Sequence, residues 1–98
     1  MAIAVVQVFR GGTLEQYDQV IENLNFTPGG QGAPGGLFHW VTETDGDVRI
    51  TDVWDSREAF EAFARDKIGP ATAAAGIAGP PEVTFFDVHN YLTAGQRS

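Results

Sequence analysis

One pair of residues in the chain has the composition of a general acid–base catalyst, His39 and Asp52. They lie in two short apolar segments on either side of an Asp45-Gly46 turn sequence. An Asp-Gly pair between apolar segments is a strong signal for a β-hairpin. Counting outward from this turn places His39 directly opposite Asp52. A carboxylate in that position would fix one tautomer of the imidazole, which general acid–base catalysis requires.

The same count gives the neighbours of the pair on its face of the hairpin. Leu37 is expected opposite Trp54, and Val41 opposite Ile50. Aliphatic and indole side chains would limit competing water around the histidine. We therefore predict a catalytic pair of His39 and Asp52, with Leu37 and Ile50 in the substrate-binding surface. The alternative is a structural cross-strand pair in a half-buried sheet, because such ion pairs also form where no chemistry takes place.

Other polar residues give weaker signals. Gln7, in the first apolar segment, could add a polar group to the same cavity as a substrate-binding residue, although a solvent-facing glutamine at a sheet edge explains it equally well. Near the end of the last apolar segment lie His89, Asn90 and Tyr91. A terminal strand that frays into polar residues is the commoner explanation of such a run.

The sequence does not favour a metal site. His39 and His89 are far apart, no HxH or HxxxH spacing occurs, and there is no cysteine. The glycine-rich segment lacks the Lys-Ser/Thr that completes a phosphate-binding P-loop. We expect neither a metal ion nor a nucleotide bound by these motifs.

Composition restricts the partners. The 98 residues suffice for one domain, and the net charge of −7 with only six Lys and Arg opposes binding to nucleic acid. The apolar segment Ala2–Phe9 is too short to span a bilayer and has no basic residues before it. We expect a cytoplasmic protein without membrane contact.

The elements that must position the pair follow from periodicity. Ala2–Phe9 is predicted as a buried strand, and Thr13 with Gln16 as the capping box of an amphipathic helix. The segment Asn25–Gly36 holds five glycines and two prolines, which predicts a mobile loop with few apolar anchors beyond Phe26 that could act as a lid.

The second half of the chain again alternates predicted strands and helices. Strands 37–43 and 48–54 form the hairpin, and Asp55 is predicted as the N-cap of a second helix that Gly69-Pro70 ends. One more helical turn is expected over 71–75, and the last strand over 82–92.

The order βαββαβ predicts an α+β, ferredoxin-like domain over residues 1–98. Right-handed crossovers around the central hairpin give a four-stranded antiparallel sheet in the order 2-3-1-4, with two helices on one face. The other face of the hairpin would carry Phe38, Trp40, Thr51 and Val53, which are largely apolar. A second copy of the chain covering this face would bury them, so we expect a homodimer.

Two segments carry a family resemblance, the junction 53–60 (VWDSREAF) and the stretch 79–83 (GPPEV). Here the chain resembles the dimeric α+β barrel superfamily, and within it the small proteins similar to antibiotic-biosynthesis monooxygenases. This resemblance implies a barrel of two face-to-face sheets with small ligands between each sheet and its helices. It also implies that Trp54, before the second helix, lines the ligand pocket as a substrate-binding residue.

The superfamily includes cofactor-free oxygenases of aromatic polyketides, cyclases, haem-degrading enzymes and stress-induced proteins. Many haem-degrading and oxygenase-like members carry a histidine in or just after the second helix, where this chain has Phe63, Lys67 and Ile68, so haem ligation from that helix is not expected. The resemblance implies an enzyme of secondary metabolism without a cofactor, which oxygenates, cyclises or isomerises an apolar aromatic or polyketide-like molecule. The alternative is a non-catalytic ligand-binding or stress-related dimer. A cavity between sheet and helices that His39 reaches would separate the two.

Overall fold

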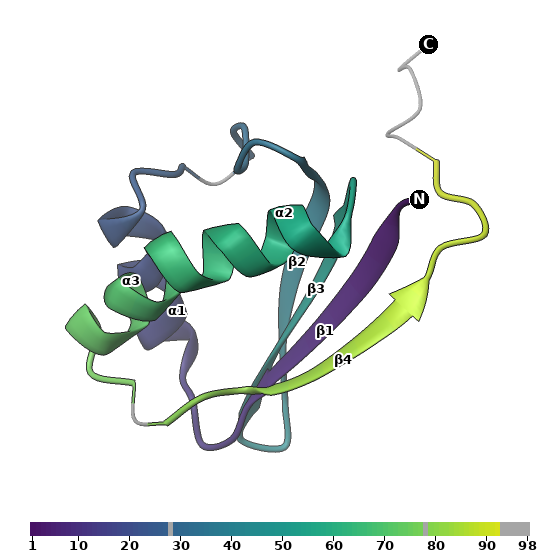
Figure 1. Cartoon of the computed structure of the whole chain (residues 1–98). Coiled ribbons are helices and arrows are strands. Elements are labelled where there is room, and N and C mark those ends of the chain that lie inside the picture. The colour runs from purple at the N-terminus through teal and green to yellow at the C-terminus, as the bar shows by residue number, and fades with distance from the viewer. Residues whose placement is uncertain (28, 78, 93–98) are drawn as a thin grey trace, which may run out of the picture.

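The computed structural model describes residues 1–27, 29–77 and 79–92. Its elements follow in the order β1 (Ile3–Phe9), α1 (Leu14–Asn23), β2 (Gly36–Thr44), β3 (Asp47–Trp54), α2 (Arg57–Phe63), the π-helical turn η1 (Ala64–Ile68), α3 (Gly69–Ala74) and β4 (Glu82–Asp87). The sheet is antiparallel in the order β2-β3-β1-β4, and α1 and the α2–α3 segment lie over one of its faces (Figure 1). The predicted ferredoxin-like α+β fold and strand order are confirmed.

β1 is one of the two central strands of the sheet and supplies part of the floor beneath the helices. Alternate residues from Ile3 to Phe9 are buried, and Val5 is fully buried. This alternation follows from the two-residue period of a strand, which points every second side chain to the same face. Gln7 belongs to this buried row.

α1 begins where the sequence predicts. The Thr13 hydroxyl accepts a hydrogen bond from the Gln16 N–H, and the Gln16 side chain accepts one from the Thr13 N–H. This capping box satisfies two N–H groups that the first helical turn leaves free. Tyr17 follows one residue later and is thereby held at a fixed position on the helix.

The predicted N-cap of α2, Asp55, is wrong by one residue. The Ser56 hydroxyl accepts the hydrogen bond from the Ala59 N–H at 3.1 Å and caps the helix. The Asp55 N–H instead donates to the carbonyl of Gly35 at 2.8 Å. Because this bond ties Asp55 to the loop that enters β2, the first helical turn begins after it.

The predicted helix stop at Gly69-Pro70 is also wrong. The chain passes from α2 through η1 into α3 without leaving the helical region, and Pro70 lies in the first turn of α3. A proline lacks the N–H that an α-helix interior uses, and its ring collides with the carbonyl four residues earlier. The wider π-turn, in which the Gly69 N–H donates to the Ala64 carbonyl, changes this bonding just before the proline.

β4 ends at Asp87, before the predicted end at Leu92. Asp87 pairs with Ile3, the first residue of β1, so the chain beyond it has no further partner strand. The polar residues 89–91 follow this end, as the fraying interpretation expects. Tyr91 packs its ring edge-on against Phe38, with ring centroids 6.2 Å apart.

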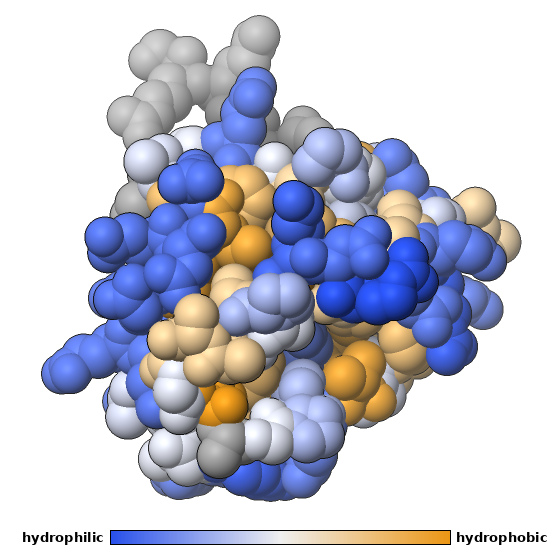
Figure 2. Space-filling view, turned by 60° about the vertical axis from the view of Figure 1, so that its left-hand side comes forward, coloured by the Kyte–Doolittle hydropathy of each residue, from blue (hydrophilic) through white to orange (hydrophobic). Residues whose placement is uncertain are grey.

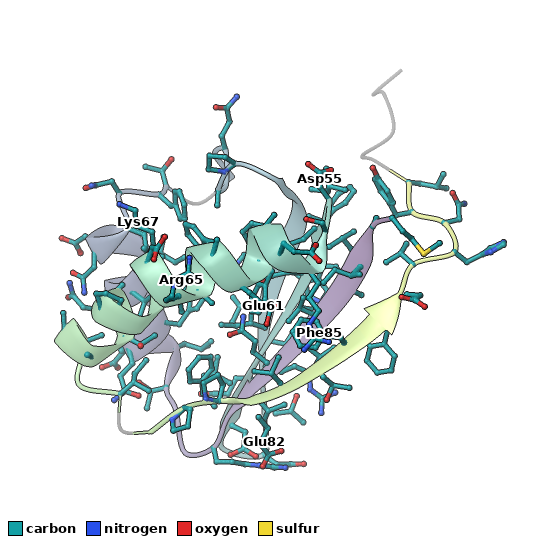
Figure 3. The ribbon with its side chains drawn as sticks, viewed as in Figure 1. Asp55, Glu61, Arg65, Lys67, Glu82 and Phe85 are labelled. Carbon is teal, nitrogen blue, oxygen red and sulfur yellow. The ribbon has the colours of Figure 1, made fainter. Side chains whose placement is uncertain are left out.

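The core lies between the sheet and the α2–η1 segment. Trp54 packs edge-on against Phe60 at 5.7 Å between ring centroids, and Phe60 against Phe85 of β4 at 5.8 Å. Figure 3 shows Phe85 on β4 beside this helical segment, and the Arg57 guanidinium lies 4.1 Å from the centre of its ring. Each fully buried aromatic side chain stabilises the fold by about 1.5–3 kcal/mol.

The loop between α1 and β2 is anchored more firmly than its glycines suggest. Phe26 stacks on Phe63 with ring centroids 6.2 Å apart, as its anchor role predicts. Ala33 is also buried in the core cluster and adds a second apolar anchor to Phe26. Gly35 has a positive φ of 85°, and a Cβ at this position would lie 3.2 Å from the Ala59 Cβ. The mobility of this loop remains a prediction.

No helix in the described part of the chain is long and apolar enough to cross a membrane.

Candidate functional site

The predicted hairpin register is confirmed around the acid–base pair. His39 lies opposite Asp52, and the ladder continues to Thr44 opposite Asp47 at the turn. The His39 Nδ1 lies 2.5 Å from an oxygen of Asp52, which is only 4% exposed. The Trp54 indole N–H donates to the other Asp52 oxygen at 3.2 Å. The carboxylate is therefore held at both oxygens within the floor of the sheet.

Tyr17 joins this pair from α1 and was not predicted as a site residue. Its hydroxyl lies 2.5 Å from the His39 Nε2. The two rings lie nearly parallel, with centroids 5.8 Å apart and 12° between their planes. In the sequence Tyr17 is one of the apolar positions of an amphipathic helix, and only the packing of α1 over β2 brings its hydroxyl to the histidine. The signal in the sequence was the hydroxyl group of Tyr17 on the apolar face of the predicted helix.

The partners define where the protons lie. Asp52 accepts hydrogen bonds, so the Nδ1 of His39 carries the proton and the Nε2 accepts from the Tyr17 hydroxyl. Burial, followed by the negative charges of Asp52 and Asp18, raises the pKa of Tyr17 to about 12. Tyr17 is therefore a neutral phenol at physiological pH. The row Tyr17, His39, Asp52 can move a proton from the cavity toward the carboxylate.

A cavity of about 1050 Å³ lies over these groups, between the sheet, α1 and the loop that enters β2. Its lining includes every residue that the sequence predicts for the site: Gln7, Leu37, His39, Ile50, Asp52 and Trp54. Figure 2 shows the side of the molecule on which α1 and this loop lie, where apolar side chains occupy recesses between polar ones. His39 is 41% exposed at its side chain, so it remains within reach of a molecule in the cavity.

Leu37 reaches the cavity by a different geometry from the one predicted. Gly36, not Leu37, pairs with Trp54, and the register shifts by one residue between Gly36 and Phe38. Leu37 is thus the extra residue of a β-bulge, in which two residues of one strand face one of its neighbour. The predicted pairing of Leu37 with Trp54 is wrong, but Leu37 still lies in the cavity lining, and its substrate-binding role stays a prediction.

Gln7 is buried rather than solvent-facing. β1 is a central strand, so the edge position that would leave the side chain in solvent does not apply. Gln7 is 4% exposed and contributes to the cavity lining beside Ile50, its partner on β3. Of the two explanations for this residue, the structure favours a polar group at the cavity.

Among residues 1–27, 29–77 and 79–92, no three or more His, Asp or Glu side chains are grouped so that they could hold a metal ion.

No family model and no curated protein matches the chain. Several solved structures share its fold. A candidate antibiotic biosynthesis monooxygenase from Chloroflexus aurantiacus is 25% identical, with a TM-score of 0.65 over 97% of this chain and 100% of that one. The cofactor-independent oxygenase SnoaB from Streptomyces nogalater is 17% identical, with a TM-score of 0.62 over 95% of this chain and 98% of that one.

A third structure contains a small molecule. The monooxygenase from the gene ActVA-Orf6 of Streptomyces coelicolor, in complex with the ligand nanaomycin D, is 20% identical, with a TM-score of 0.56 over 96% of this chain and 92% of that one. Each of these similarities extends over nearly the whole length of both compared chains. The chain therefore has the ferredoxin-like α+β fold of the antibiotic biosynthesis monooxygenase-like proteins.

Proposed function

We propose that the protein is an enzyme of secondary metabolism that removes a proton from an apolar aromatic or polyketide-like molecule and thereby starts its oxygenation, cyclisation or isomerisation. The observation that carries this proposal is the hydrogen-bonded row of Tyr17, His39 and Asp52 at the wall of a large cavity. A histidine held in one tautomer by a buried carboxylate has a free ring nitrogen that can act as a general base.

The proton would move in one direction along the row. A phenolic or enolic hydroxyl of the substrate donates to the Tyr17 oxygen, while the Tyr17 hydroxyl donates to the His39 Nε2. Transfer of both protons leaves the substrate as a phenolate or enolate and His39 as an imidazolium beside Asp52. The carboxylate stabilises this cation, and the apolar walls exclude water that would compete for the proton.

The anion then determines the reaction. An electron-rich phenolate or enolate can give its electrons to O₂, so that an activated CH₂ group and O₂ become a C=O group and water. In this oxygenation the substrate itself supplies the electrons, and the proposal needs no resident cofactor. Without O₂, the same anion can attack a carbonyl within the molecule, which gives cyclisation, or be protonated at another carbon, which gives isomerisation.

A second subunit completes this proposal. We infer that two copies pack their open sheet faces together, because Trp40 is 51% and Phe86 54% exposed there in the single chain. Exposed aromatic side chains of this size favour burial in an interface. Gln7, His39 and Asp52 line the cavity from the opposite, helix-covered face, and Trp40 also belongs to the lining, so the cavity reaches the β2 edge of the sheet.

The main alternative is a ligand-binding protein that performs no reaction. The cavity and the position of His39 support any function that binds a small molecule, and the hydrogen-bonded row favours the enzyme over a passive binder. Nanaomycin D, the ligand of the Streptomyces coelicolor structure, is a suitable first probe of binding. Calorimetric titration should detect its binding under either function, and turnover separates the two.

The test of catalysis uses hydroxylated polycyclic aromatics with an activated CH₂ group, followed by oxygen consumption and product mass. His39→Ala should lower the turnover number by about 10²-fold or more, which is the usual contribution of a positioned base. Asp52→Asn should lower it similarly, because the amide can present an N–H to the histidine and favour the wrong tautomer. Tyr17→Phe should reduce turnover while the protein stays folded.

His89→Ala is the matched control, since His89 is exposed beyond β4 and does not line the cavity. It should have the activity of the wild type. Full activity in His39→Ala would remove the proposed base. Binding of nanaomycin D without turnover of any substrate in the panel would favour the ligand-binding alternative.

A further inference from the structure

Gln7 is an amide in an otherwise apolar stretch of the cavity floor. On its own strand the neighbours on the same face are Val5 and Phe9, and its partners across the sheet are Ile50 and Val83. The residues on the buried face of a strand are ordinarily aliphatic or aromatic. An amide on this face loses its hydrogen bonds to water, and apolar neighbours cannot replace them.

The Gln7 amide has no hydrogen-bond partner among the described residues, although the residue is 4% exposed. None of the described polar side-chain atoms is both fully buried and without a partner. The amide atoms of Gln7 therefore keep some exposure, and the residue lines the cavity. A carbonyl or hydroxyl of a bound molecule would restore the hydrogen bonds that the amide gives up on folding.

The sheet register places Gln7 well away from His39. The two residues lie on strands β1 and β2, with β3 between them. Gln7 pairs with Ile50, whereas His39 pairs with Asp52, two residues further along β3. Strand spacings of about 4.8 Å and a rise of about 3.3 Å per residue put the two attachment points about 12 Å apart. Two or three fused rings, lying on the floor between them, fit this separation.

We propose that Gln7 binds a hydrogen-bonding group at the end of the substrate that is remote from His39, and so selects flat aromatic molecules with a polar group at each end. This inference rests on the proposed function, because it takes the Tyr17–His39 end of the cavity as the reacting end. Gln7 is then a specificity-determining residue that contacts substrate without moving a proton.

The experiment compares two ligands and three proteins by calorimetric titration. The ligands are naphthol, with one hydroxyl, and a dihydroxynaphthalene with its second hydroxyl on the opposite ring. The wild type should bind the diol more tightly than naphthol by roughly 5- to 100-fold, the effect of one hydrogen bond to a buried polar group. Gln7→Met, which keeps the length of the side chain but removes the amide, should bind both ligands equally.

Gln19→Met is the matched control, because Gln19 is an exposed residue of α1 that does not line the cavity. It should keep the preference for the diol. Gln7→Met should melt at the same temperature as the wild type or higher, since a thioether suits the apolar floor better than an amide. If Gln7→Met does not fold, Gln7→Leu is tested in its place.

The outcomes separate this inference from the proposed function. Tyr17→Phe should weaken both ligands by the same factor, because each has a hydroxyl for the Tyr17 end. Suppose that Tyr17→Phe weakens the binding of both ligands equally, but the wild type does not prefer the diol, or Gln7→Met keeps that preference. Gln7 then does not bind the remote hydroxyl, and this inference fails while the proposed function stands. If neither ligand binds the wild type, the substrate class of the proposed function fails together with the inference.

Discussion

At the scale of single residues, the site depends on which group receives the hydrogen bond of the Tyr17 hydroxyl. The phenol hydroxyl donates to the His39 Nε2, which leaves its oxygen lone pairs free to accept from a molecule in the cavity. An ionised Tyr17 could no longer donate this hydrogen bond, because the phenolate has no proton to give to the histidine. The raised pKa of Tyr17, about 12, keeps the donor in place through the neutral range.

The same pKa predicts an alkaline loss of stability. The ordinary pKa of tyrosine is 10.0, and burial followed by the charges of Asp52 and Asp18 raises the pKa of Tyr17 to about 12 in the folded protein. Between these two pH values the folded protein binds the proton more tightly than the unfolded chain does. The contribution of Tyr17 to stability is therefore complete below pH 10 and is lost as the pH rises toward about 12.

Urea unfolding below pH 10 and again near pH 11 measures this effect. The free energy of unfolding of Tyr17→Phe should fall less steeply over this range than that of the wild type, because phenylalanine has no proton to lose. Tyr91→Phe, which leaves Tyr17 in place, should follow the wild type. Identical pH profiles for Tyr17→Phe and the wild type would show that Tyr17 is not buried beside Asp52 as described.

At the scale of the elements, the β2–β3 turn fixes the site. Asp45 and Gly46 both have positive φ angles, 52° and 81°, as a tight two-residue hairpin turn requires. From this turn the ladder runs without interruption to His39 and Asp52, so the placement of the pair depends on the turn residues. A shift of one residue would move His39 to the other face of the sheet.

Gly46→Ala tests this dependence. A methyl group at Gly46 meets no atom within 4 Å, so the whole cost comes from the left-handed backbone conformation. We expect a loss of about 1 kcal/mol in the free energy of unfolding. Gly32→Ala is the matched control, because Gly32 also has open space but no positive φ, and it should be neutral. Equal effects at the two glycines in denaturant titrations would contradict the turn geometry.

The turn also explains how much of the site the sequence predicts. The pairing of His39 with Asp52 follows from an Asp-Gly signal and a two-residue period, both of which are local. The contact of Tyr17 with His39 depends on how α1 packs over β2, which no local pattern encodes. The bulge at Leu37 and the π-turn before Pro70 are likewise hydrogen-bond arrangements that appear only once neighbouring elements are in place.

At the scale of the whole molecule, the open sheet face predicts the assembly. Trp40 is half exposed in the single chain, whereas Val53, its neighbour on the same face, is only 8% exposed. Trp40→Asp should therefore leave the chain folded and disrupt only an interface, since an unpaired carboxylate in a dry contact costs several kcal/mol. Val53→Asp would unfold the chain and is uninformative.

Light scattering on a sizing column provides the measurement. The wild type should have about twice the chain mass of 10.5 kDa, and Trp40→Asp should have the mass of one chain. Circular dichroism should be the same for both. A wild type that elutes as one chain at micromolar concentration would contradict the paired-sheet barrel.

The bulge at Leu37 has a consequence for how such proteins diverge. It lies between the α1–β2 loop and the stretch of β2 that carries His39, and the register of that stretch is set from the opposite end, by the Asp45-Gly46 turn. We expect the bulge to absorb a shift of the chain when residues are added to or removed from the loop, before that shift reaches the histidine. The entrance of the cavity is thus free to lengthen or shorten over generations, and new molecules can be admitted, while the acid–base machinery stays unchanged.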